Sequence, residues 1–141
     1  MCQGAILWES HASTAVEVLK ERAAFLSVIR THTGWDLDED SARLIFTEIV
    51  GNAIRHAQDP TRARLVCDGS VVELCVTDSG SGFRTVPKPP SPLSQGGRGL
   101  FLVSAYADAL HFNRRNDRFS ITARLPRSHR PQANQGSFAS A

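Results

Sequence analysis

The sequence predicts an α+β domain, a two-layer sandwich in which helices pack on one face of a mixed, mostly antiparallel sheet. Two observations support this prediction. Two long segments in the first half repeat apolar residues at the period of an amphipathic helix, and later segments alternate apolar and polar residues as half-buried strands do. The 141 residues are enough for one core of this kind.

Length and composition indicate one domain followed by a tail. We expect the domain to span residues 1–126, because residues 127–141 have almost nothing to bury except Phe138 and are predicted to be disordered. The formal net charge of +2 gives no strong electrostatic footprint for nucleic acid. No apolar run approaches the ~18 residues that a membrane helix needs. We therefore expect no direct nucleic-acid partner and no membrane.

The cysteine and histidine patterns predict neither a disulfide framework nor a zinc site. Cys2, Cys67 and Cys75 are odd in number and form no Cys-x-x-Cys pair. Cys67 and Cys75 fall in strand-like runs, where we expect them to fill space. The five histidines are scattered, and none has a second ligand at metal spacing. A cytoplasmic location is the expectation that follows.

The first part of the chain reads as a strand and two helices. Residues 5–8 predict a short strand, and residues 15–33 predict a helix that Thr14 and Glu17 open with capping-box spacing. A second helix is predicted over residues 38–57, and its first turn is acidic, which suits the positive end of the helix dipole.

The strands that follow read as a hairpin. Alternating segments at residues 62–67 and 71–77 flank Asp68-Gly69, which is a strong signal for a two-residue turn. A turn at that position would set Arg64 opposite Glu73. The apolar residues of both strands would then share one face of the sheet.

A loop, a helix and two further strands complete the predicted fold. Residues 84–95 hold four of the seven prolines and read as a loop. A third helix is expected over residues 99–108, and closing strands over residues 110–114 and 118–125.

Glu48 and Asn52 are the first candidate functional residues. They are spaced i,i+4, so they project from the same side of the second helix, at the flank of its apolar arc. Gly51 lies beside them, and glycine within a helix costs ~1 kcal/mol relative to alanine. A missing side chain there would let a ligand approach the backbone. The alternative is a surface pair beside a tolerated glycine.

Asp78 is the second candidate, because by parity it continues the apolar face of its strand. A carboxylate at the inner end of a core strand is costly unless a group hydrogen-bonds to it. Gly80 and Gly82 follow at once and free the backbone to bend around a ligand. The alternative is an ordinary turn-forming aspartate before Ser-Gly.

A glycine-rich helix start is the third candidate. Gly97 and Gly99 flank Arg98 just before the third predicted helix, where free N–H groups and the helix dipole favour phosphate. The pattern is neither a P-loop, since no Gly-Lys-Ser/Thr follows, nor a dinucleotide fingerprint after a strand.

In this order the three motifs resemble those of the GHKL, or Bergerat-fold, ATPase superfamily. Residues 48–57 resemble its N box, residues 78–82 its first glycine box and residues 97–100 its second. The resemblance covers residues 15–126 and implies ATP and Mg²⁺ as ligands.

Carried over residue by residue, the resemblance implies specific roles. Asn52 would coordinate Mg²⁺ that bridges the phosphates, and Asp78 would accept a hydrogen bond from the adenine amino group. The loop at residues 84–95 would be the ATP lid. The other nucleotide contacts implied are Gly80, Gly82, Gly97, Arg98, Gly99 and Leu100.

Glu48 and Ser120 carry the two remaining assignments. The resemblance implies that Glu48 is the catalytic acid–base residue, acting on water or on a substrate serine hydroxyl. The family's usual Gly-Thr before the final strand is absent here, and Ser120 is the candidate substitute.

The resemblance is greatest to the anti-sigma factor serine/threonine kinases. It implies phosphorylation of an antagonist protein on serine, sequestration of a sigma factor or other regulator, and a homodimer. Two alternatives stay open. One is a non-catalytic nucleotide-binding partner-switch module, and the other is a stand-alone histidine-kinase-like catalytic domain.

Overall fold

The computed structural model describes most of the chain, in five stretches. These are residues 4–32, 36–56, 60–78, 98–115 and 118–128. Several predicted features lie outside them: the glycines at 80, 82 and 97, the loop at residues 84–95, and the tail beyond residue 128.

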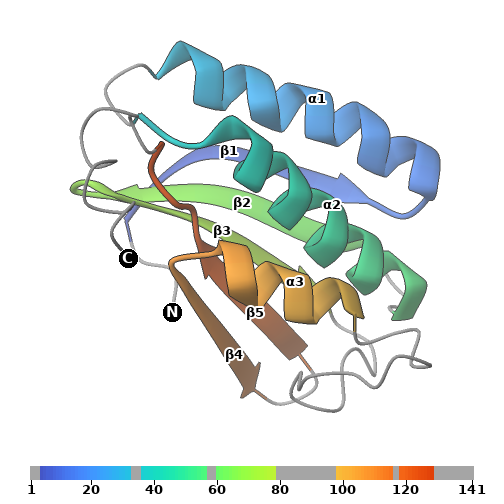
Figure 1. Ribbon diagram of the computed structural model, residues 1–141. Helices are drawn as coiled ribbons and strands as arrows, with labels where there is room; N and C mark the ends of the chain where they lie inside the picture. Colours follow the sequence, from blue (N-terminus) through green and yellow to red (C-terminus); the bar gives the residue numbers. More distant parts are fainter. Residues whose placement is uncertain (1–3, 33–35, 57–59, 79–97, 116–117, 129–141) are drawn as a thin grey trace.

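The fold is the predicted α+β sandwich (Figure 1). Five strands form one sheet in the order β1-β2-β3-β5-β4. The strands are β1 (Ala5–Ala12), β2 (Thr61–Asp68), β3 (Val71–Asp78), β4 (Ala109–Arg115) and β5 (Arg118–Arg124). Three helices of the described part, α1 (Ala15–Thr31), α2 (Glu39–His56) and α3 (Arg98–Tyr106), lie side by side on one face. The strand pairings of the described residues are all antiparallel, whereas we expected a mixed sheet.

The two long helices begin where capping side chains satisfy their first N–H groups. At α1 the Thr14 hydroxyl accepts from the Glu17 N–H at 3.2 Å, and the Glu17 carboxylate accepts from the Thr14 N–H at 3.2 Å. The predicted capping box is therefore confirmed. At α2 the Asp38 carboxylate accepts from the N–H groups of Asp40 and Ser41.

The β2–β3 hairpin corrects the predicted register. Asp68 pairs with Val71, so Gly69 and Ser70 form the turn, and Gly69 adopts a left-handed φ of 65°. Arg64 consequently lies opposite Cys75 and not opposite Glu73. The error is two residues, and because strand side chains alternate with a period of two, the predicted inner face is unchanged.

The core fills the space between the helices and the inner face of the sheet. Trp8, Phe25 and Phe46 form an aromatic cluster there, with ring centroids 4.7 to 5.9 Å apart. Strand β1 extends beyond the predicted residues 5–8 to Ala12, because it pairs along the whole of β2. The buried inner-face residues of β2, β3 and β5 are Ala63, Leu65, Val72, Leu74, Val76, Ile121 and Ala123.

The outer face of the sheet corrects one expectation about cysteine. Cys67 is a free thiol, but Cys75, which is buried on β3, is disulfide-bonded. The cysteine pattern therefore no longer supports the expected cytoplasmic location.

Candidate functional site

Among the predicted site residues that the structure describes, Asn52, Asp78 and the first residues of α3 lie at one end of the sandwich. At the opposite end, the Asp38 N–H donates to Pro126 O at 2.9 Å and the Leu125 N–H donates to Val72 O at 2.9 Å, so α2 and β3 both begin there. The 18 residues of α2 and the 8 of β3 each span roughly 26 Å, so the two elements end together. We call this the site end.

Helix α3 runs in the other direction and begins at the site end (Figure 1). The Asp108 N–H, just after α3, donates to Arg124 O at 3.0 Å, which places the last turn of α3 at the far end. Val103 is fully buried and anchors the helix, which packs against α2. The first helical residues are Arg98, Gly99 and Leu100, so the free N–H groups of α3 lie at the site end, as phosphate binding requires.

Asp78 ends β3 on the inner face, as its parity predicted. It is 2% exposed and pairs across the sheet with Phe119 of β5. Burial of a carboxylate is costly without hydrogen-bond donors. We therefore expect polar donors to contact Asp78 at this end of the strand.

Asn52 is also buried, at 3% exposure, on the last turns of α2. The Arg55 Nη2 donates to its Oδ1 at 3.1 Å. This burial excludes the alternative that Asn52 is an ordinary surface residue. Glu48, one turn earlier on the same side, is half-buried and therefore accessible to a reactant.

Gly51 has open space beside it. A Cβ built at this position would approach no atom more closely than Arg55 Nη1, at 4.0 Å. Among the described residues, packing therefore does not require glycine here, although glycine lowers the helix propensity. An open backbone beside Asn52 suits a ligand that approaches α2.

Thr61, the first residue of β2, is a functional candidate that the sequence reasoning missed. It is 1% exposed, and its Oγ1 has no hydrogen-bond partner among the residues that the structure describes. The expected strand began at Arg62, which left Thr61 in a loop. The signal that identifies it is parity, because Thr61 continues the inner face of Ala63.

Ser120 is not brought together with Asp78. It pairs with Thr77, while the neighbouring Phe119 pairs with Asp78. Side chains on opposite faces of a strand alternate, so Ser120 lies on the outer face and Phe119 on the inner one. Phe119 is buried against Phe112, and the Arg114 guanidinium lies 5.1 Å from its ring centroid.

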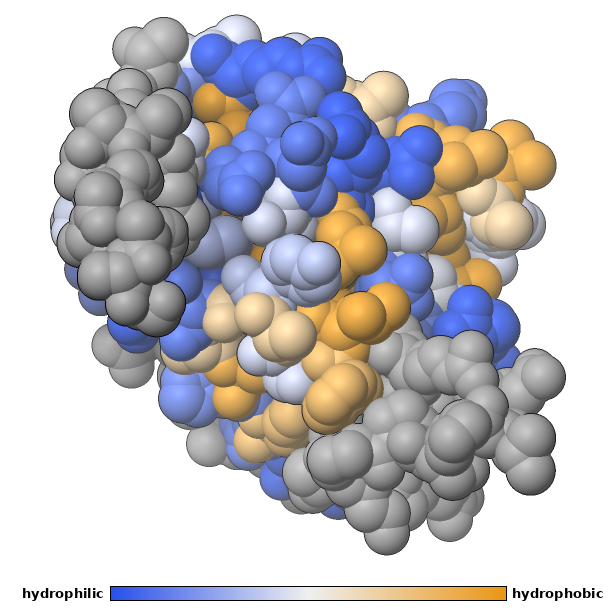
Figure 2. Space-filling view, viewed as in Figure 1, coloured by the Kyte–Doolittle hydropathy of each residue, from blue (hydrophilic) through white to orange (hydrophobic). Residues whose placement is uncertain are grey.

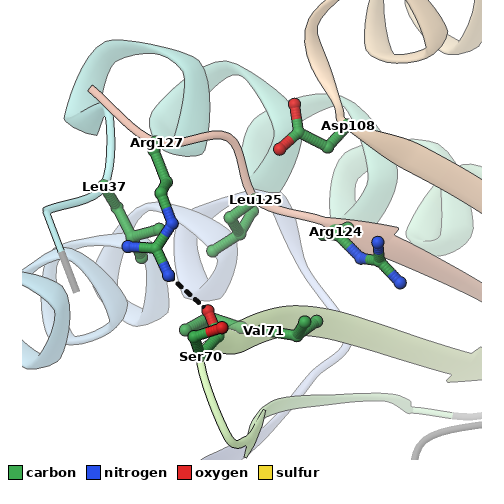
Figure 3. A pocket seen from close by; sticks show the side chains of 8 residues that line it. Leu37, Ser70, Val71, Asp108, Arg124, Leu125 and Arg127 are labelled. Atoms are coloured by element: carbon green, nitrogen blue, oxygen red, sulfur yellow. Dashed lines mark hydrogen bonds between the residues drawn. The ribbon is translucent and has the colours of Figure 1, made fainter. Parts of the chain in front are cut away.

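A cavity of about 200 Å³ lies at the end opposite the site (Figure 3). The Arg127 side chain reaches across it, and Nη2 donates to Ser70 O at 2.6 Å. Leu37, Val71 and Leu125 form its apolar wall. Its lining residues Leu37 and Val71 lie where α2 and β3 begin, whereas Asn52 and Asp78 lie toward the ends of these elements.

The described part of the chain shows neither a metal cluster nor a membrane-spanning helix. No three histidine, cysteine, aspartate or glutamate side chains in it gather as a metal cluster. None of its helices is long and apolar enough to cross a membrane.

Comparison with known proteins assigns this geometry to a family. A family model described as a histidine kinase-like ATPase domain matches residues 12–125, which cover all the described strands and helices except part of β1. No curated protein matches the sequence significantly.

Proposed function

The chain belongs to the histidine kinase-like ATPase family, which implies ATP binding, and from that premise we propose an ATP-dependent regulatory kinase. In this proposal it phosphorylates a serine or threonine of an antagonist protein and sequesters a sigma factor or other regulator. The observation that carries the proposal is the burial of Asn52 and Asp78 where α2 and β3 end together.

The residues of the site end fit ATP with Mg²⁺. Asp78 offers a buried acceptor for the adenine amino group, and the open backbone at Gly51 leaves room beside α2. The amide oxygen of Asn52 is a hard oxygen ligand of the kind Mg²⁺ accepts, with phosphates and water filling the other positions. When bound, Mg²⁺ supplies charge neutralisation at the phosphates.

Arg55 holds the Asn52 amide in its present orientation. Its guanidinium donates to the same Oδ1 that would contact the metal. The Asn52 oxygen is therefore already bonded to a cationic group, which fits its proposed role as a ligand of Mg²⁺. Arg55 is exposed, so its side chain is free to turn aside when a nucleotide binds.

Glu48 is proposed as the general base. It is half-buried and lies one helical turn before Asn52, on the side of α2 that the nucleotide would face. Its carboxylate would take the proton of the acceptor hydroxyl as that oxygen bonds to the γ-phosphorus. The bond from the γ-phosphorus to the bridging oxygen of ADP breaks in the same step.

Glu48→Gln tests this assignment in the full chain. We expect transfer from γ-labelled ATP to a co-encoded antagonist to fall at least ~100-fold, the usual contribution of a general base, with ATP affinity within about twofold of the unmodified protein. Glu73→Gln, on the outer face, is the matched control and should change neither quantity. Full transfer by Glu48→Gln would reject Glu48 as the base.

The same measurements separate the two alternatives. ATP binding without transfer to any candidate partner would favour the non-catalytic partner-switch module, which the outer-face position of Ser120 also favours. An acid-labile phosphoryl product would identify a histidine acceptor.

Exposed apolar side chains support a protein partner. Figure 2 shows apolar side chains gathered on this face of the molecule, and Val16 and Leu19 of α1 are 67% and 56% exposed. Large contiguous apolar patches on protein surfaces commonly mark binding sites. The proposed regulator, the antagonist and the second copy of a homodimer are the candidate partners.

A further inference from the structure

Thr61 and Asp78 lie side by side at the site end. Ala63 pairs with Val76 in the β2–β3 ladder. Thr61 lies two residues before Ala63, and Asp78 lies two residues after Val76, so both continue the same inner face to the same end of neighbouring strands. Both are buried, at 1% and 2% exposure.

The hydroxyl of Thr61 plays no visible part in the described portion of the fold. Its Oγ1 is buried without a hydrogen-bond partner in the described part of the chain. Valine has the same shape and an equal preference for strands, and it would remove an unsatisfied polar atom. Buried polar groups in native proteins are nearly always satisfied, so a ligand bound at the site end is an explanation that fits the described residues.

We propose that the Thr61 hydroxyl donates a hydrogen bond to ring nitrogen N1 of the bound adenine. This inference rests on the proposed nucleotide site and adds a residue that sets base specificity. Adenine presents an amino donor and the N1 acceptor on one edge. Asp78 supplies an acceptor and Thr61 a donor on adjacent strands, which matches that edge.

The position of Ser120 strengthens the assignment. Ser120 of β5 was expected to place its hydroxyl near the adenine. It pairs with Thr77 instead, so its side chain lies on the outer face of the sheet. The inner-face neighbour of Asp78 on β5 is Phe119, which offers no hydroxyl. Among the described residues of β2, β3 and β5, Thr61 is the one that places a hydroxyl beside Asp78 on the inner face.

The test is a cycle that changes the protein and the base together. Binding of ATP and of 1-deaza-ATP, which lacks the N1 acceptor, is measured by calorimetry with Mg²⁺ for the full chain and for Thr61→Val. We expect Thr61→Val to weaken ATP binding about 5- to 10-fold and to leave 1-deaza-ATP binding unchanged. Thr61→Ser should bind ATP as the unmodified protein does.

Two controls separate binding from folding. Ser120→Ala removes a hydroxyl at the same end on the outer face, and it should leave ATP affinity unchanged. The unfolding midpoint of Thr61→Val without nucleotide should equal or exceed that of the unmodified chain, since an unsatisfied hydroxyl is removed.

The outcomes distinguish this inference from the function on which it rests. ATP binding by Thr61→Val at full strength, or an equal loss for both nucleotides, overturns the role of Thr61 while the nucleotide site stands. If the unmodified chain binds no ATP, the proposed function fails and this inference fails with it. If Thr61→Val does not fold, equal binding of the two nucleotides by the unmodified protein overturns the proposal, and a 5- to 10-fold difference supports it.

Discussion

The two ends of the sandwich use polar groups in opposite ways. At the end that holds residues 36–38, 70–72 and 125–128, which we call the clasp end, backbone groups bond to one another. The Ser128 N–H donates to Asp36 O at 2.7 Å, and the Leu125 N–H donates to Val72 O at 2.9 Å. At the site end, buried polar side chains take their place: Asn52, Thr61 and Asp78.

This difference fits the proposal that the clasp end stabilises the fold and the site end binds nucleotide. Backbone pairs at the clasp end join three segments that are distant in sequence, so they contribute to stability without any ligand. Burial of polar side chains at the site end costs free energy that hydrogen bonds must offset, and we propose that a bound nucleotide supplies some of those bonds. Substitutions at the two ends should therefore have separable effects.

Asp78→Asn should have the largest effect on binding. The amide keeps the size of the side chain but cannot accept a charge-assisted hydrogen bond, which is worth about 1.5–3 kcal/mol. We expect ATP affinity to fall about 10- to 100-fold in calorimetry.

The matched control for this variant lies at the other end of the hairpin. Asp68→Asn changes an exposed aspartate beside the β2–β3 turn and should leave ATP affinity unchanged. If Asp78→Asn bound ATP as tightly as the unmodified chain, Asp78 would not contact the nucleotide, and the proposed difference between the two ends would be rejected.

The parts of this site that sequence predicted depend on local pattern. The buried positions of Asn52 and Asp78 follow from helical and strand periods, and an error of two residues in the hairpin register left the inner face unchanged. Thr61 was missed because the strand boundary was set one residue late, and boundaries depend on pairing with β1 that no local pattern encodes.

The clasp end was not predictable for the same reason. The predicted domain stopped at residue 126, yet Arg127 and Ser128 bond to the domain through Ser70 and Asp36. Arg127 and Ser70 are 57 positions apart in the sequence. No sequence motif marks either residue as a contact. Long-range backbone pairing is set by the assembled fold and not by neighbouring residues.

Arg127→Ala should have a smaller effect, confined to stability. Its guanidinium donates to Ser70 O at 2.6 Å and holds the last described residues against the β2–β3 turn. Loss of such a hydrogen bond costs about 1 kcal/mol, which denaturant unfolding resolves. ATP affinity should stay within about twofold, because the change is at the clasp end.

Lys20→Ala is the control for loss of one positive charge. Lys20 is exposed on α1, and its removal should change neither stability nor ATP affinity measurably. A loss of ATP affinity in Arg127→Ala at unchanged stability would show that the two ends are coupled.

Glu39→Gln should have the smallest effect, visible only as a change in pH dependence. The Arg30 Nε donates to Glu39 Oε2 at 3.0 Å, joining the end of α1 to the start of α2. This hydrogen bond is the main reason that the pKa of Glu39 lies below its ordinary value of 4.5. Partial burial raises the pKa, and the charges of Arg30 and Arg43 lower it further. A carboxylate with a depressed pKa stabilises the fold above that ordinary value, and the contribution is lost as the pH falls through the lower folded pKa.

The expected result follows from that sign. At neutral pH, Glu39→Gln should unfold at slightly lower denaturant concentration than the unmodified chain, and the difference should disappear as the pH falls below 4.5. Both side chains are partly exposed, so added salt should also reduce the difference. Asp40→Asn, in the same helical turn but paired with Arg43, controls for the helix dipole. A difference that persists unchanged at low pH would show that the Arg30–Glu39 pair does not stabilise the clasp end through its charge.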